Sequence, residues 1–477
     1  MAVKAATALK YIDEKRNHLT ALAGEIWEYS ELALHEDKSA VALEKALEAE
    51  GFKVEVGVGG MPTAFVATWG SGRPVIGFLG EYDALSGVSQ KIQPTRDPRV
   101  EGAPGHGCGH NLLGVGSYAA AIGLKKEMEA RGLPGTIKYF GCPAEENLSG
   151  KAFMARDGAF DGVDACLTWH PGQLNRVPGG SSLANNAMNI TFRGKSAHAA
   201  GDPYNGRSAL DAVQLMNLGV EFLREHMPPK ARVHYVITNG GDQPNVVPAI
   251  AKVWYLVRAP QRHQVDELYE RVLKCAEGAS IMTDTTYEIE LLKAIWNVLP
   301  NPTLDELVDQ CLQRVGPPEF TAADLEFATE IQKTIGPKLI ESSVEKSQLS
   351  KEDLKTVKGQ ILNTTIVSPP VTGKEPSGST DVGDVSWCTP TVEFNTACNA
   401  IGTPGHSWQY CAQAGMGIGQ AGMMTAAKTM AEAAFELMTN PELVAKAKAD
   451  FDELTGGRKY KSAMPPEQKP AFHQFAD

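Results

Sequence analysis

The stretch R-P-V-I-G-F-L-G-E-Y-D-A-L at residues 73–85 combines a run of apolar residues with two acidic residues near its end. Such a run has the length and composition of a strand that is buried on both faces. In an α/β sheet, ligands bind at the carboxyl ends of the strands. The position of Glu81 and Asp83 therefore places a candidate site at the end of this predicted strand.

The chain repeats this arrangement further along. Residues 117–132 have the apolar spacing of a helix, and buried-strand patterns follow at 135–146 and 163–171. Alternating strands and helices are typical of an α/β sheet. The two later strands end in Glu145, Glu146 and His170. We therefore expect these side chains to gather at one edge of a mixed central sheet that is flanked by helices.

Residues 186–298 have a different pattern, in which strands and helices follow in the order β-α-β-β-α-β. That order is the split motif of a ferredoxin-like α+β domain. Because this unit is self-contained, we expect it to be inserted into a larger domain formed by residues 1–185 and 299–477. Within the second part of the larger domain, the polar stretch 340–380 is expected to form long loops or mobile structure.

Charge and composition exclude several classes of protein. The 477-residue chain has a net charge of −12 and no basic run, so we expect no nucleic-acid partner. The N-terminal segment lacks the apolar core of a signal peptide, and no stretch approaches the roughly 18 apolar residues of a membrane span. We expect a cytoplasmic protein without a membrane partner. The eight cysteines are scattered, so we expect no disulfide framework.

The segment G-H-G-C-G-H-N at residues 105–111 places histidine and cysteine at alternate positions among glycines. Cysteine and histidine are favoured ligands of zinc and similar metals. Glycines allow the tight backbone turns that bring such side chains to one point. A metal site and a turn that merely contains two histidines are both compatible with this segment alone.

Three further segments carry candidate ligands. P-A-E-E at 143–146 places two carboxylates side by side, so one could bind a metal while the other acts as general base to a water. The alternative is a pair of solvated acids. L-T-W-H-P and G-T-P-G-H-S-W-Q each contribute a histidine that, alone, reads as a structural or loop residue. Together the segments supply Cys108, His110, Glu146, His170 and His406. Five ligands suit two ions about 3.5–4 Å apart with a shared ligand.

The order of these motifs resembles that of the di-metal aminoacylase and glutamate carboxypeptidase family. The shared features are H-x-C-G-H, P-x-E-E, a following histidine, G-K-S-A-H-A-A, N-V-V-P-x-x-A and a late G-x-x-x-H. The likeness as a whole runs from about residue 20 to 440. H-x-C-G-H marks the amidohydrolase branch of that family. Asn111 stands where the branch usually has aspartate, and Asp83 is a candidate partner for a ligand.

The resemblance implies a role for each candidate residue. Cys108 would bridge the two ions, and Glu145 would be the general base. His198, in G-K-S-A-H-A-A, would lie on the inserted domain. It would polarise the scissile carbonyl of the substrate that is bound in the partner subunit. Asn245 and Arg258 would hold the substrate carboxylate. From the sequence pattern alone, Arg258 reads as a surface charge at a strand end.

The resemblance also implies the fold and the reaction. The fold would be a metallopeptidase-like α/β catalytic domain with an inserted ferredoxin-like domain that serves as lid and dimerisation domain. The activity would be metal-dependent cleavage of the amide bond of N-acyl amino acids, with p-aminobenzoyl-glutamate as the leading candidate and two zinc or manganese ions per subunit. An aminoacylase or dipeptidase for other N-capped amino acids is an alternative, as is a non-catalytic subunit of a two-chain hydrolase. The expected assembly is a homodimer, with a paired homologous subunit as a further partner.

Overall fold

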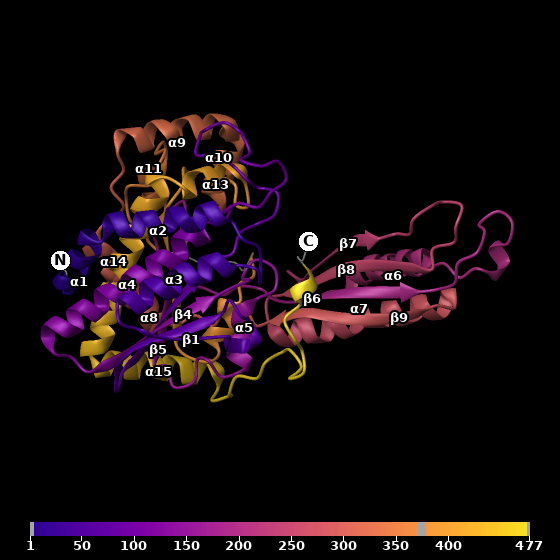
Figure 1. Ribbon diagram of the computed structural model, residues 1–477, viewed down its shortest axis with the longest axis horizontal. Helices are drawn as coiled ribbons and strands as arrows, with labels where there is room; N and C mark the ends of the chain where they lie inside the picture. The colour runs from indigo at the N-terminus through magenta and orange to yellow at the C-terminus, as the bar shows by residue number, and fades with distance from the viewer. Residues whose placement is uncertain (1–3, 370–377, 475–477) are drawn as a thin grey trace.

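The structure is a computed structural model that describes residues 4–369 and 378–474. Its larger part is built on a six-stranded mixed sheet (Figure 1). The strands lie in the order β1 (Lys53–Val56), β2 (Phe65–Ser71), β4 (Gly135–Cys142), β3 (Val75–Glu81), β5 (Ala165–Gly172) and β10 (Thr391–Ala397). Strands β4, β3, β5 and β10 run parallel, and β2 and β1 continue the sheet in antiparallel pairs. The parallel strands therefore end at one common edge, as the sequence predicted.

Helices cover both faces of this sheet, and their apolar sides form two cores. The larger core joins one face to α1 (Ala6–Glu14), α2 (Arg16–Tyr29), α3 (Asp37–Ala49), α4 (His110–Arg131), α8 (Pro302–Val315), α14 (Gly417–Thr439) and α15 (Pro441–Thr455). The smaller core joins the opposite face to α5 (Gly150–Arg156), α12 (Val382–Ser386) and the base of the second sheet. A sheet that is buried on both faces explains the apolar runs of its strands.

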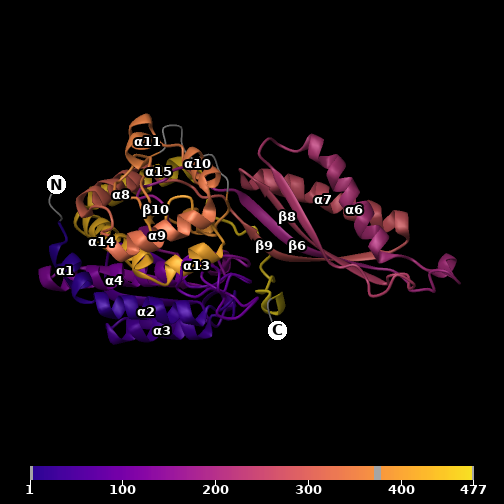
Figure 2. The same cartoon turned by 90° about the horizontal axis from the view of Figure 1, so that it is seen from above.

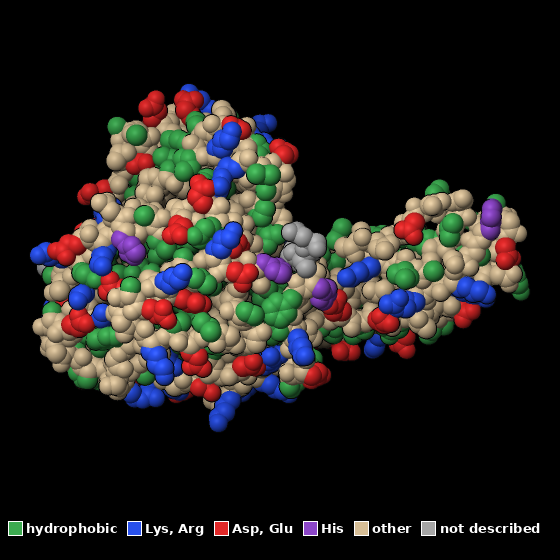
Figure 3. Space-filling view, viewed as in Figure 1, with side chains coloured by type: hydrophobic (Ala, Val, Ile, Leu, Met, Phe, Trp, Pro, Cys, Tyr) green, Lys and Arg blue, Asp and Glu red, His purple; other side chains and the backbone are tan. Residues whose placement is uncertain are grey.

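The second sheet forms the inserted ferredoxin-like domain, which we call the lid. Its elements follow in the predicted order: β6 (Ala184–Arg193), α6 (Ala209–Leu223), β7 (Arg232–Asn239), β8 (Ile250–Ala259), α7 (Arg262–Thr283) and β9 (Thr286–Ile295). The strands pair antiparallel in the order β7-β8-β6-β9. Helices α6 and α7 cover one face of the sheet (Figure 2). The lid projects from the larger body as a narrow arm (Figure 3).

The strand register defines two ends of the lid. Ala184 pairs with Ala259 where the sheet joins the body, and Arg193 pairs with Ile250 at the far end. Ten residues at about 3.3 Å each separate these pairs by about 30 Å. Residues in the loops beyond Arg193 and before Ile250 therefore lie at the tip of the lid, far from its base.

The expectation of long loops at 340–380 was wrong for part of that stretch. It contains most of α10 (Pro337–Lys346) and all of α11 (Lys351–Val357). Ile340, Val344 and Val357 pack in a small apolar cluster, because apolar residues recur at helical spacing within an otherwise polar sequence. Residues 370–377, which the same expectation included, lie outside the described residues.

The remaining elements are short or peripheral. They are α9 (Ala322–Ile335), α13 (Trp408–Ala414) and the 3₁₀ turns Val58–Gly60, Pro203–Asn205, Arg224–His226 and Phe472–Gln474. No helix in the described ranges is long and apolar enough to cross a bilayer. All eight cysteines are free in the structure.

Candidate active site

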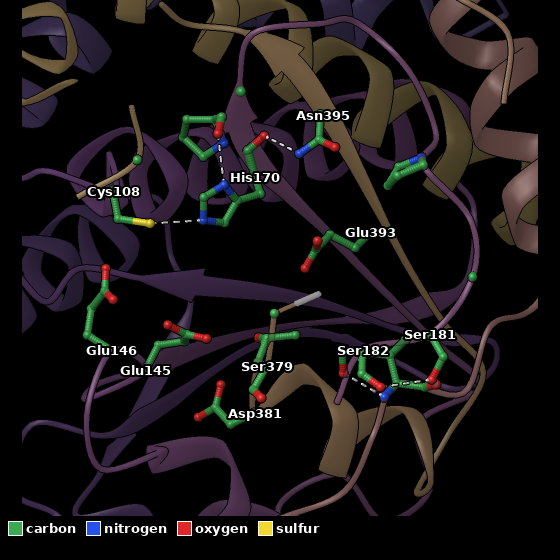
Figure 4. A pocket seen from close by; sticks show the side chains of 18 of the residues that line it. Cys108, Glu145, Glu146, His170, Ser181, Ser182, Ser379, Asp381, Glu393 and Asn395 are labelled. Carbon is green, nitrogen blue, oxygen red and sulfur yellow. Dashed lines mark hydrogen bonds between the residues drawn. The ribbon is translucent and has the colours of Figure 1, made fainter. Parts of the chain in front are cut away.

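A cavity of about 560 Å³ lies where the carboxyl ends of the parallel strands meet the base of the lid. Cys108, Glu145, Glu146, His170 and His406 line it from the body, and Asn185, Arg258 and Lys293 line it from the lid. In Figure 4, Cys108, Glu145, Glu146 and His170 surround one end of the cavity. The cavity therefore brings together residues that lie far apart in the chain, such as Cys108 and His406, which are 298 positions apart.

Backbone geometry determines how the glycine-rich segment presents its side chains. Gly109 has a φ of 79°, and a Cβ there would lie 3.1 Å from both Pro171 and Tyr410. Glycine therefore fits this turn, which directs Cys108 and His110 toward one place. The backbone N–H of His406 donates a hydrogen bond to the Gly107 carbonyl at 3.1 Å, so the second glycine-rich loop lies against the first.

The five predicted ligands form two overlapping groups. Potential ligand atoms of Cys108, His110 and His170 lie within 4.8 Å of one another, as do those of Cys108, Glu146 and His406. Cys108 Sγ is 3.3 Å from His170 Nε2, and Glu146 Oε2 is 3.5 Å from His406 Nε2. Only Cys108 belongs to both groups. The geometry is compatible with two neighbouring ions that share the Cys108 sulfur.

The hydrogen bonds of His110 and His170 favour metal binding. His110 Nδ1 donates to Asp83 Oδ1 at 2.8 Å, and His170 Nδ1 donates to the Pro171 carbonyl at 2.8 Å. In a neutral ring, Nε2 then carries the lone pair, and in both residues it faces the cluster. Among the described residues, His110 Nε2 and Glu146 Oε1 are buried without a hydrogen-bond partner. A cation between them would satisfy both atoms, so the donor set fits a metal.

The electrostatics of the cluster also favour a bound cation. Burial raises the pKa of Glu146 to about 8 and raises the pKa of the Cys108 thiol well above its usual range. Burial and the charge of Glu81 raise the pKa of Glu145. Ionising several such groups in one dry site is costly without a compensating positive charge. Divalent ions would supply that charge.

A buried ion network that the sequence did not predict lies beside the cluster. Glu81 Oε2 lies 3.2 Å from His110 Nε2, and Glu81 Oε1 pairs with Lys151 Nζ at 2.6 Å. Lys151 also pairs with Asp381 at 2.5 Å. The acidic end of the strand at 73–85 pointed to Glu81. Neither Lys151 nor Asp381 gave a signal, because their partners are distant in the sequence.

Two residues of the first motif have structural roles. His106 is buried and its Nε2 donates to the Ile26 carbonyl at 3.0 Å, while burial lowers its pKa to about 3. The Asn111 amide donates to the carbonyls of Ala23 and Ala414 at 3.1 and 3.0 Å. An amide makes both contacts, which explains why asparagine suits a position where the family usually has aspartate.

The three residues that the resemblance assigned to the lid lie at opposite ends of it. His198 and Asn245 are exposed in adjacent loops at the tip, where the Ala199 N–H donates to the Asn245 carbonyl at 3.0 Å. Neither residue lines the cavity among the described residues of this chain. Arg258 does line it, from the base of the lid. The length of the lid strands therefore separates these tip residues from the base, which lines the cavity of this chain, by about 30 Å.

Comparison with known proteins places this geometry in a family. Residues 185–280 match the model of the peptidase dimerisation domain. The chain is 43% identical to one of the subunits of the p-aminobenzoyl-glutamate hydrolase of Escherichia coli (strain K12), over 96% of this chain and 97% of the relative. It is 30% identical to the Xaa-Arg dipeptidase of Mus musculus, over 93% and 91% of the two chains.

The fold has a counterpart among solved structures. A dinuclear metal-binding peptidase of the M20 family from Bacillus subtilis superimposes with a TM-score of 0.55 and 18% identity, covering 90% of this chain and 99% of that one. At this identity the likeness concerns the fold, while the 43% identity over nearly the whole chain establishes the kinship. The chain therefore belongs to the M20 family of metal-dependent hydrolases, and the family resemblance seen in its motifs is confirmed.

Proposed function

We propose that this enzyme cleaves the amide bond of p-aminobenzoyl-glutamate, releasing p-aminobenzoate and glutamate. The observation that carries the proposal is the cavity in which five candidate metal ligands lie beside the additional carboxylate Glu145 and the cation Arg258. The name of the relative with 43% identity supplies the substrate.

We propose Cys108, His110, Glu146, His170 and His406 as the ligands of two divalent ions. Thiolate and imidazole favour zinc, and the carboxylates also accept manganese. When bound, the ions would polarise the scissile carbonyl and acidify the attacking water. Asp83 holds the His110 ring through Nδ1, so the ligand nitrogen has one orientation before any ion binds.

Glu145 is the proposed general base. Its side chain points into the cavity next to Glu146 (Figure 4). Its carboxylate would accept a proton from the attacking water and return that proton to the nitrogen of the leaving amine. Arg258 would bind the α-carboxylate of the substrate with its planar guanidinium, in two parallel hydrogen bonds. The Nε of Arg258 is buried and has no hydrogen-bond partner in the described structure.

Residues 186–298 would act as a lid that completes the site of a second subunit. His198 Nδ1 accepts hydrogen bonds from the N–H groups of Ala200 and Gly201 at 3.2 and 3.0 Å. The ring proton then lies on the other nitrogen, so His198 can donate to a carbonyl oxygen. Together with Asn245 at the lid tip, His198 would act on the substrate that is bound in the partner.

A homodimer through the lid would allow this arrangement. The dimerisation-domain match supports it. So do the apolar residues Leu218 and Phe222 of α6 and Val236 and Ile237 of the edge strand β7, which are 40–74% exposed. An unpaired edge strand beside exposed apolar side chains is suited to pairing with another copy. A paired homologous subunit remains part of the proposal because the bacterial relative is named as one subunit of a hydrolase.

A dipeptidase for basic amino acids is the second candidate function. The acidic residues Asp305 and Glu393 also line the cavity, and a carboxylate there could bind a cationic side chain. The 30% identity to an Xaa-Arg dipeptidase favours the same alternative.

A substrate panel separates these activities. The purified single chain, supplied with Zn²⁺ or Mn²⁺, is assayed by chromatography on p-aminobenzoyl-glutamate, an N-acetyl amino acid and an alanyl-arginine dipeptide. We expect the highest kcat/KM for p-aminobenzoyl-glutamate. Preferential cleavage of the dipeptide would establish the second candidate. An inactive single chain that gains activity only with a homologous subunit would identify a supporting subunit.

A further inference from the structure

Lys293 is a buried cation of the active-site cavity that the proposed mechanism leaves without a role. It lies on β9 at the base of the lid, is only 8% exposed and lines the same cavity as Glu145 and Arg258. Burial lowers its pKa, and the charge of Arg258 lowers it further, while the acids Glu145, Asp381 and Glu146 oppose this effect. Within the described ranges, none of these acids forms an ion pair with the Lys293 ammonium, and no hydrogen bond to it is found.

Lys151 provides a contrast in the same region. It is fully buried, and its ammonium forms ion pairs with Glu81 at 2.6 Å and with Asp381 at 2.5 Å. Buried ammonium groups are normally compensated in this way, because an unpaired buried charge is costly. The fold compensates Lys151 with its own carboxylates and leaves Lys293 facing the cavity. This difference points to a partner for Lys293 that enters from outside.

The neighbours of Lys293 define which kind of partner would fit. Asn185 on β6 pairs with Arg258 on β8, and Ala187 on β6 pairs with Lys293 on β9. Because side chains two residues apart share a face of a sheet, Arg258, Asn185 and Lys293 all project from the same face. Arg258 Nε and Asn185 Oδ1 are buried without hydrogen-bond partners in the described structure. The base of the lid thus presents two cations and an amide to one cavity.

We propose that Lys293 binds the side-chain carboxylate of the amino-acid half of the substrate and so makes the enzyme selective for N-acylated acidic amino acids. The inference rests on the proposed amide hydrolysis. It adds that Arg258 holds the α-carboxylate while Lys293 holds the second one. Two separate cations match the two carboxylates of a glutamate residue. When the dicarboxylate enters, ion pairing with it offsets the free-energy cost of burying both cations. A neutral side chain would leave the Lys293 charge buried and unpaired.

The test compares p-aminobenzoyl-glutamate with p-aminobenzoyl-glutamine, which differ only in the charge and hydrogen bonding of the side-chain terminus. Lys293→Met keeps the length of the side chain and removes its charge. For the glutamate substrate we expect kcat/KM to fall by about 10- to 100-fold, mainly through KM, which is the size of a charge-assisted hydrogen bond. For the glutamine substrate we expect no loss. Lys293→Arg should retain most of the selectivity.

Two further variants control the experiment. Lys274→Met removes a charge from an exposed position of α7 and should change neither substrate's kinetics. Arg258→Ala should reduce kcat/KM for both substrates alike, because both carry the α-carboxylate. Circular dichroism and the elution volume in size-exclusion chromatography show whether each variant folds and assembles as the wild type does.

The outcomes separate this inference from the proposed function. If Lys293→Met lowers kcat equally on both substrates, Lys293 serves as a counter-ion of Glu145 or supports the fold, and the inference is wrong. Unchanged kinetics on the glutamate substrate also overturn it, while the proposed function stands. If the wild type cleaves neither compound, the proposed function fails, and the inference fails with it.

Discussion

The hydrogen-bond partner of Nδ1 determines whether Nε2 of His110 and His170 is available to bind a metal ion. Asp83 and the Pro171 carbonyl each accept a hydrogen bond from an Nδ1–H group, so both Nε2 atoms turn toward the Cys108 sulfur. His106, only four positions before His110, instead uses its Nε2 for a backbone carbonyl. Side chains of the same type in one motif therefore have different functions, according to the hydrogen bonds that surround them.

Single substitutions can test whether Glu145 is the general base and Glu146 a metal ligand. Glu145→Gln keeps size and hydrogen bonding but cannot accept a proton. We expect turnover to fall at least about 10²-fold, the usual size of general-base effects. Metal content, measured by elemental analysis, should stay near that of the wild type. Glu146→Gln is the matched control and should lose metal. If Glu145→Gln loses metal and Glu146→Gln retains it, the two roles are reversed.

Sequence patterns predicted some residues of this site and gave no indication of others. Cys108 and His110 stand out because cysteine and histidine alternate with glycine in this segment. Lys151 and Lys293 gave no signal, since a lysine in a helix or strand usually lies at the surface. Only the folded chain shows that Lys151 is paired with Asp381 and that Lys293 has no ion-pair partner among the residues that the structure describes.

Among the elements, the sheets were the most predictable part. Their strands are short apolar or alternating runs, and the order β-α-β-β-α-β of the lid follows from those runs alone. The first and last residues of the helices were harder to predict from the sequence. The helix predicted at 117–132 begins at His110, because Gly109 adopts the left-handed conformation that lets a helix start directly after the turn. The helices α10 and α11 were missed because their polar residues outnumber the apolar ones that pack.

Asp384 connects three segments of the chain at the junction of body and lid. From α12, its carboxylate accepts hydrogen bonds from the Trp296 N–H at the end of β9, at 3.1 Å, and from the Tyr460 hydroxyl at 2.7 Å. Burial raises the pKa of Asp384 to about 7, above the usual value of about 3.9 for an unfolded chain. The folded protein therefore holds this proton more tightly than the unfolded chain does.

This shift predicts the pH dependence of stability. The stabilising contribution of the protonated Asp384 is complete below about pH 4 and is lost as the pH rises through about 7, at about 1.4 kcal/mol per pH unit. Asp384→Asn cannot ionise, so its melting temperature relative to the wild type should rise between pH 4 and pH 7. Calorimetry across this range measures the difference, with the exposed Asp242→Asn as control. Parallel curves for Asp384→Asn and the wild type would show that Asp384 does not titrate in this window.

On the scale of the whole molecule, the lid separates the proposed site residues. Arg258 and Lys293 are at its base, and His198 and Asn245 are at its tip, about 30 Å away along ten-residue strands. The sequence could place His198 in the inserted domain. It could not show that the tip lies far from this chain's own cavity, because that distance follows from the projection of the arm (Figure 1).

Hybrid dimers test whether His198 acts across subunits. His198→Ala and Glu145→Gln homodimers should each be nearly inactive. After mixing under conditions that exchange subunits, a hybrid holds one site with an intact Glu145 and an intact His198 from the partner, so activity should return toward half of the wild-type value per hybrid. Differently tagged chains allow the hybrids to be isolated and counted. Isolated hybrids without activity would show that His198 acts within its own chain or has no catalytic part.

The central claim is that one cluster of five ligands, with Glu145 beside it, performs metal-dependent amide hydrolysis. Titration of the chelator-treated chain with Zn²⁺, while p-aminobenzoyl-glutamate cleavage and bound metal are followed together, tests it most directly. We predict that activity is absent without metal and rises until about two ions are bound per chain. Glu145→Gln should bind the same number of ions and remain inactive. Full activity in the metal-free chain, or full activity of Glu145→Gln, would contradict the account.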